Sequence, residues 1–127
     1  MLNVTVKRRR WYRGQESDSC LRRPQDNKMC CLGFASIAAG WKPKDIRGQA
    51  MPACVVTHQV CQYDLKVNIP EALKKLIRKK SSIYYADSRI GAKLAGINDD
   101  TTITDSVREK KLKKLAAKIG IRFKFID

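Results

Sequence analysis

KMCCLGFASIAAG, at residues 28–40, is the longest apolar run of this otherwise highly charged chain. Small residues alternate in it with large ones, as is typical of a helix that packs closely against its neighbours. Gly40 followed by Pro43 is a helix stop signal, and Asp26 or Asn27 could cap the start. The sequence therefore predicts a central helix over residues 28–40.

Both ends of the chain alternate apolar and polar residues. Residues 2–7, LNVTVK, and 121–125, IRFKF, have the two-residue period of half-buried strands. Apolar spacing also predicts helices at 70–80 and 104–119, the last capped by Thr104. Pro43 near a first turn and Gly48 as a stop predict a short helix at 42–48. We expect the terminal strands to pair in a small antiparallel-containing sheet, with helices 28–40, 70–80 and 104–119 packed on one face. This is an α+β fold in a single domain, residues 1–127.

The segment between residues 53 and 100 has mixed signals. CVVT at 54–57 is β-prone, and residues 61–67 alternate like an internal strand. Residues 81–96 join the β-prone IYY to SRIGAKLAG, which could form a short helix broken by Gly91, and the sequence does not decide between the two. Residues 98–100, NDD, and the polar stretch 14–27 are predicted to form a turn and a loop.

The chain is strongly basic. It has 27 Lys and Arg against 12 Asp and Glu, a formal net charge of +15, and the cations are spread along it rather than gathered in a tail. Such a charge attracts polyanions, so nucleic acid, a nucleoprotein or an acidic protein surface are the expected partners. The plainer alternative is a solvated basic surface with no dedicated ligand.

The cysteine pattern points to a reducing compartment. There are five cysteines, one histidine and no C-x-x-C spacing, and no secretory signal core precedes them. No stretch approaches the ~20 apolar residues that a membrane helix needs. We expect a cytoplasmic protein without membrane association or cofactor, whose thiols act mostly as small core residues.

A cysteine nucleophile is the sharpest catalytic hypothesis. Cys30 or Cys31 would lie in the first turn of the central helix, where the helix dipole lowers the pKa of a thiol. His58 follows in a β-prone region, the order found in papain-like hydrolases, and Gln25 could supply an oxyanion donor. Because the residues around the two cysteines are apolar, we favour the alternative that both thiols are buried packing residues.

Two groups of side chains could be imagined around a metal ion. The first, spaced i, i+4, i+7, consists of Cys54, His58 and Cys61, with Cys20 or Cys30 to complete it. The second consists of Asp99, Asp100 and Asp105. The first lacks a C-x-x-C knuckle, and turn formation and helix N-terminal charge explain the second, so no metal site is predicted.

Two cation clusters are candidates for contacts with nucleic-acid phosphates or with a protein partner. The first interleaves cations with aromatic rings that could stack on bases, and its members are Arg8, Arg9, Arg10, Trp11 and Arg13. For Trp11 we favour the alternative that the ring anchors the strand-to-loop junction in the core.

The second cluster lies on the closing helix. Lys110, Lys114 and Lys118 recur every four residues with Lys113 beside them, and the alternative is a solubilising face. Arg122 and Lys124 would extend the charge on the outer sheet face, where no aromatic ring alternates with them.

WYRG at 11–14, LRR at 21–23, KMCCLGF at 28–34, DIRG at 45–48 and a closing INDD…TD…RE…GIRFKF at 97–125 occur together in this chain. This combination resembles a set of small bacteriophage-encoded proteins of unassigned function. The closing helix and strand are richer in lysine than in those proteins, and residues 53–90 lie outside the resemblance. The resemblance implies an accessory phage product that acts in a bacterial host cell, against a host or defence system.

The leading hypothesis is a non-enzymatic phage accessory protein whose basic surface binds nucleic acid or a nucleic-acid-handling host complex. The alternative is an anti-defence or host-takeover inhibitor that docks on an acidic surface of a host enzyme, steered by the same cations. A Cys/His hydrolase comes third. The sequence leaves open whether the partner is DNA, RNA or protein, and which oligomeric state the chain adopts.

Overall fold

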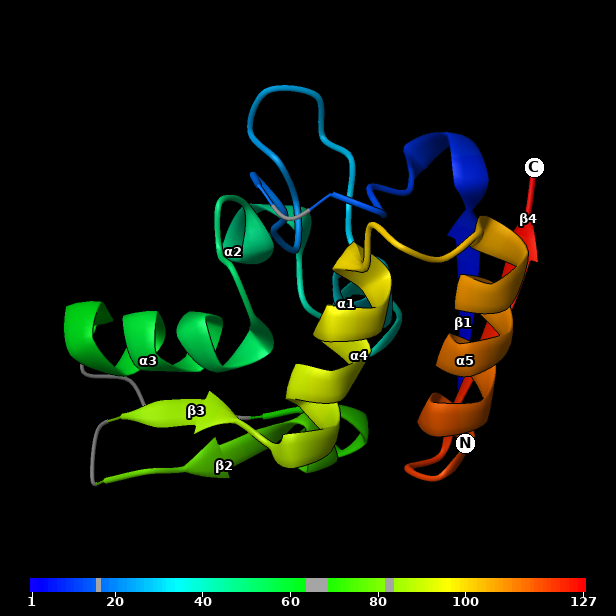
Figure 1. Ribbon diagram of the computed structural model, residues 1–127. Helices are drawn as coiled ribbons and strands as arrows, with labels where there is room; N and C mark the ends of the chain where they lie inside the picture. The colour runs from blue at the N-terminus through cyan, green and yellow to red at the C-terminus, as the bar shows by residue number, and fades with distance from the viewer. Residues whose placement is uncertain (16, 64–68, 82–83) are drawn as a thin grey trace.

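The computed structural model describes residues 1–15, 17–63, 69–81 and 84–127, with the backbone only for residues 61–63. Figure 1 shows the terminal strands side by side at one end and a helix over a second strand pair at the other. The elements follow one another in the order β1 (Leu2–Lys7), η1 (Arg8–Arg10), α1 (Cys31–Ala38), α2 (Pro43–Ile46), α3 (Pro52–Tyr63), η2 (Glu71–Leu76), β2 (Ile77–Lys79), β3 (Tyr85–Asp87), α4 (Arg89–Asp99), α5 (Asp105–Ala117) and β4 (Ile121–Ile126).

The terminal strands pair with each other, which confirms the α+β class and the expected joining of the two ends. β1 and β4 run parallel in a register that begins with Leu2 opposite Ile121. The antiparallel pairing occurs in a second two-stranded sheet, β2 with β3. Two neighbouring parallel strands need a crossover connection. In this chain the whole segment between β1 and β4 forms that connection.

Helices cover one face of the terminal sheet. α1 packs against β1 and α5 against β4, while α4 lies between the two helices and contacts both. The buried strand residues that meet these helices are Val4, Val6, Ile121, Phe123 and Phe125. The alternate strand positions are exposed except Ile126, which is half-buried, so most of the outer face of the sheet lies open to solvent.

The central helix is shorter than the sequence predicts. It begins at Cys31, because the residues before it pair with the N-terminal segment: the Met29 N–H donates to the carbonyl of Arg10, and the Tyr12 N–H donates to the carbonyl of Met29. Neither expected cap is used. The first N–H of α1 instead donates to the side chain of Asn98, which comes from α4.

The β-prone reading of residues 54–57 and 61–67 is wrong as far as the structure describes them. Residues up to Tyr63 belong to α3, and residues 64–67 lie outside the described residues. Pro52, Val55 and Val56 are buried and Gln59 and Val60 half-buried, which is a helical spacing. The local pattern gave a wrong strand prediction because the β-branched residues of this segment also fit the buried stripe of a helix.

The predicted helix 70–80 is only half correct. Glu71–Leu76 forms a 3-10 helix, and Ile77–Lys79 continues as β2 because it pairs with Tyr85–Asp87. The undecided segment thus contains a strand and then α4, which passes through Gly91 without a break. α4 also includes Asn98 and Asp99, so the turn predicted at 98–100 is wrong for these two residues.

The remaining helix predictions are confirmed. α2 begins with Pro43 at its first position, inside the predicted range 42–48. α5 lies inside the predicted range 104–119, and the Thr104 side chain accepts a hydrogen bond from the Val107 N–H as its cap. Among the described residues, no helix has the length and apolar character needed to cross a membrane.

Candidate nucleic-acid interface

A buried amide side chain ties the motif-bearing segments together. Asn98 has no solvent exposure, and its Oδ1 accepts hydrogen bonds from Trp11 Nε1 at 2.8 Å and from the Cys31 N–H at 2.9 Å. Its Nδ2 donates to the Tyr12 carbonyl and to Asp99 Oδ1. All the hydrogen bonds that an amide side chain can readily make at its two ends are therefore made inside the protein.

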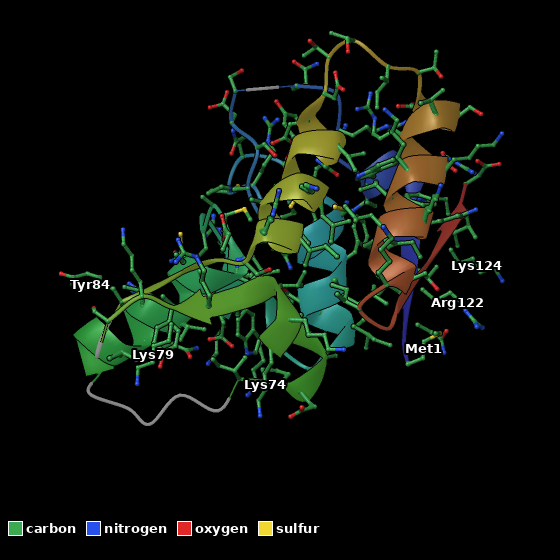
Figure 2. All side chains as sticks on the ribbon, turned by 60° about the horizontal axis from the view of Figure 1, so that its bottom comes forward. Met1, Lys74, Lys79, Tyr84, Arg122 and Lys124 are labelled. Atoms are coloured by element: carbon green, nitrogen blue, oxygen red, sulfur yellow. The ribbon has the colours of Figure 1, made fainter. Side chains whose placement is uncertain are left out.

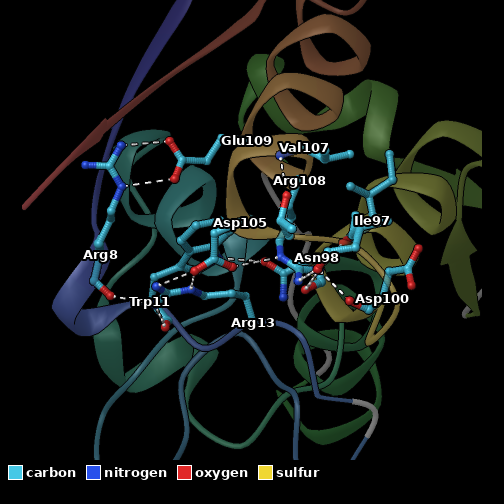
Figure 3. A network of polar contacts seen from close by, with 12 residues as sticks. Arg8, Trp11, Arg13, Ile97, Asn98, Asp100, Asp105, Val107, Arg108 and Glu109 are labelled. Carbon is cyan, nitrogen blue, oxygen red and sulfur yellow. Dashed lines mark hydrogen bonds and ion pairs between the residues drawn. The ribbon is translucent and has the colours of Figure 1, made fainter.

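A buried arginine completes the network (Figure 3). Arg108 is 3% exposed, and its Nε pairs with Asp105 at 3.4 Å. Its two terminal nitrogens donate at 2.6–3.3 Å to main-chain carbonyls around the end of α4, those of Ile97, Asn98, Asp100 and Ile103. The guanidinium thus supplies hydrogen bonds to carbonyls around the helix end that have no intrahelical donor.

The other two arginines of this network, from the first cation cluster, are held in ion pairs. Arg8 binds Glu109 through two parallel hydrogen bonds, at 3.0 and 2.8 Å, and also contacts Asp127. These hydrogen bonds raise the pKa of Arg8 further above its ordinary value. Arg13 binds Asp105 at 2.9 Å and thereby lowers the pKa of that carboxyl group. Both arginines connect the segment after β1 to α5, and Figure 3 shows them converging on it.

Trp11 belongs to the core, as the favoured alternative holds. Its ring is 2% exposed and lies 4.8 Å from that of Phe125, and the Arg13 guanidinium covers it at 4.7 Å. A ring in this position has no free face for a base. The WYRG, IND, TD and RE motifs therefore meet in one structural network rather than in a binding surface.

The cysteine pair lacks the properties of a nucleophile. Cys30 and Cys31 are buried, and burial raises the pKa of Cys30 to about 12 and that of Cys31 well above its usual range. The dipole at the start of α1 does not offset this desolvation. His58 lies on α3 with an exposed side chain. The structure therefore does not support the Cys/His hydrolase.

The described members of the two imagined metal sets do not come together either. Among the described residues, no three His, Cys, Asp or Glu side chains lie close enough together to hold a metal ion, and the Cys61 side chain lies outside them. Asp99 accepts a hydrogen bond from Ser19, and Asp100 accepts from Thr102, which lowers the pKa of Asp100. These carboxylates serve local structure.

The second cation cluster is exposed as predicted. Lys110, Lys114 and Lys118 lie along one line of α5, with Lys111 adjoining, and their side chains are exposed. Lys113 lies on another side of the helix, where its ammonium group is 5.8 Å from the centre of the Phe125 ring. None of these five lysines forms an ion pair with a residue that the structure describes.

A third group of cations lies on the outer face of the terminal sheet. Arg122 and Lys124 point outward from β4, as Figure 2 shows, and Lys7 points outward from β1. Thr5 and Lys124 are register partners, so the two strands form one surface. No carboxylate occupies an outward position of either strand within Leu2–Lys7 or Ile121–Ile126.

Arg9 and Arg10 extend this face past the end of β1. Both are exposed, and neither makes a side-chain hydrogen bond or ion pair within the described part of the chain. They line an open groove of about 750 Å³ between β1 and α1, together with Lys7. The structure therefore divides the first predicted cluster: Arg8, Trp11 and Arg13 are structural, and Arg9 and Arg10 face solvent.

Sequence reasoning missed this groove. The strand alternation that predicts β1 already places Lys7 on the same face as Arg122 and Lys124, so this part of the surface had a usable signal. The apolar side of the groove comes from Met29, Phe34 and Ile37, whose spacing indicates only a packed helix.

Comparison of the chain with protein-family models, curated proteins and solved structures finds no match in any of the three.

Proposed function

We propose that this chain is a non-enzymatic phage accessory protein that acts in the host cytoplasm by binding nucleic acid through its basic surface. The phage origin rests on the motif resemblance alone. The binding function rests on charge, and its contacts are the lysines of α5 and the cations of the outer sheet face: Lys110, Lys111, Lys114, Lys118, Lys7, Arg9, Arg10, Arg122 and Lys124.

The proposal rests on which cations the nearby carboxylates pair with. Asp105 and Glu109 of α5 and Asp127 at the chain end are all bound by arginines of the structural network. Within the described part of the chain, the lysines beside them on α5 and the cations outside β1 and β4 have no carboxylate partner. Unpaired cations on rigid elements attract a phosphate backbone and release its counterions on binding.

This arrangement supports contacts to phosphate rather than to base edges. Lysines along an exposed helix line can follow a backbone but carry no sequence information by themselves. We therefore expect salt-dependent binding with little sequence preference. The runner-up, docking on an acidic protein surface, would use the same cations, and it predicts co-purification with a protein after nuclease treatment in place of nucleic-acid binding.

Charge-neutral variants test the proposal. Lys110→Gln, Lys114→Gln and Lys118→Gln together remove three charges from one line of α5. The logarithm of the binding constant falls as the logarithm of the salt concentration rises. Each lost phosphate contact reduces the magnitude of this negative slope by about 0.9 for duplex DNA. We expect the triple variant to bind a labelled oligonucleotide more weakly and with a slope smaller by about two to three.

A matched control removes the same charge elsewhere. Lys75, Lys79 and Lys80 are also exposed, on η2 and around β2, and Figure 2 shows this region at the end of the molecule away from β4. Their combined replacement by Gln should leave the slope nearly unchanged. Equal loss in the two triple variants would mean that net charge alone drives binding and that the proposed surface has no special role.

A further inference from the structure

The groove between β1 and α1 has two chemically different sides. Met29, Phe34 and Ile37 form an apolar side, and Lys7, Arg9 and Arg10 form a cationic side. Among the residues that the structure describes, no carboxylate lines the groove. Its volume of about 750 Å³ lies within the range of pockets that hold small ligands.

The fold explains why these side chains meet. Lys7 ends β1 on the outer face, and the 3-10 turn that follows places Arg9 and Arg10 beside it. Arg8 of the same turn is fixed to Glu109, so the turn is anchored while its neighbours stay exposed. The cations are thus held in place, and no described carboxylate neutralises them.

The apolar side is held just as firmly. Met29 is bonded through its main chain to Arg10 and Tyr12, and it is half-buried. Phe34 is 8% exposed and Ile37 half-buried on the next turn of α1. An apolar floor that stays accessible beside three unpaired cations is suited to a ligand with a flat apolar part and an anionic part.

We infer that this groove receives an unpaired base of a single-stranded nucleic acid, with the adjoining phosphates at Lys7, Arg9 and Arg10. The inference rests on the proposed function and adds a preference to it. A base in a duplex is stacked and paired, so its face cannot reach the floor, whereas a single strand can turn a base into the groove. The cationic outer face, reached through Thr5 and its partner Lys124, continues the backbone path.

Three oligonucleotide probes test the inference: a labelled oligothymidine of about 12 nucleotides, within the site size of small single-strand binders, an abasic strand with the same number of phosphates, and a duplex of equal length. Base contact predicts that the purified protein binds oligothymidine about tenfold or more tighter than the abasic strand, since a base lying on the apolar floor removes roughly 60 Å² of apolar surface from water. It should also bind oligothymidine tighter than the duplex.

Truncation of the floor localises the effect. Met29→Ala combined with Ile37→Ala should bring oligothymidine affinity to within about threefold of the abasic strand and leave abasic binding unchanged. Tyr84→Ala removes an exposed ring outside the groove and should change neither affinity. Phe34 is left intact because it packs in the core, and thermal unfolding confirms that each variant is folded.

The outcomes separate the two proposals. Equal affinity of the unmodified protein for oligothymidine and the abasic strand, or an equal loss for both probes in the floor variant, would overturn the base-binding groove while leaving phosphate binding intact. Failure to bind any of the three probes at low salt would overturn the proposed function, and the groove inference with it.

Discussion

Replacement of Asn98 by Ala tests whether the motif residues serve the fold. The change removes the acceptor of two buried donors, Trp11 Nε1–H and the Cys31 N–H, and the donor to the Tyr12 carbonyl. A buried polar group without a partner costs about 1–3 kcal/mol. Two orphaned donors together predict a loss of about 3–5 kcal/mol in the free energy of unfolding, a large part of the stability of a small domain.

Equilibrium unfolding in urea measures this loss. Far-UV circular dichroism should serve as the main probe, because Trp11 contacts the altered side chain and its fluorescence will change for local reasons. Asn3→Ala is the matched control: Asn3 is exposed on β1, and its loss should cost at most about 0.5 kcal/mol. A loss below about 1 kcal/mol for Asn98→Ala would refute the view that this amide holds the segments together.

Two further predictions concern packing and pH. Gly91→Ala should destabilise the protein because a Cβ there would lie 2.6 Å from a main-chain carbonyl of η2, whereas Gly96→Ala, on the same helix with open space around it, should stabilise it by up to about 1 kcal/mol; thermal unfolding of the pair checks both signs. Arg13 lowers the pKa of Asp105, so this ion pair stabilises the fold above the ordinary carboxyl pKa of about 4 and is lost as the pH falls below it. The melting temperature of Arg13→Gln should therefore fall less than that of the unmodified protein between about pH 5 and pH 2.5, and parallel curves would contradict the assignment.

The fold was predictable where one face of an element meets the core and the other meets water. The strict alternation of the terminal strands and the capped stripe of α5 are such cases. Local pattern failed where a distant segment decides the conformation. Ile77–Lys79 becomes a strand because Tyr85–Asp87 pairs with it, and Cys31 begins a helix because Asn98, far along the chain, receives its N–H.

The candidate site also has a part that the sequence predicts and a part that it does not. Lys110, Lys114 and Lys118 are predictable because helical spacing alone places them on one exposed line. The segment with Arg8, Arg9, Arg10 and Arg13 reads as one basic patch, but its two halves differ because Glu109 and Asp105 reach only Arg8 and Arg13. Which cation is paired depends on tertiary contacts, and these contacts cannot be predicted from the local sequence pattern.

The proposed function requires that unpaired cations on rigid elements bind a phosphate backbone. The most direct measurement is the affinity of the nuclease-treated, unmodified protein for a labelled oligonucleotide over a series of salt concentrations. Phosphate binding by these cations should give tight binding at low salt that weakens linearly on a log–log scale, with a slope matching several phosphate contacts. Absence of binding at low salt, or affinity that does not change with salt, would contradict it.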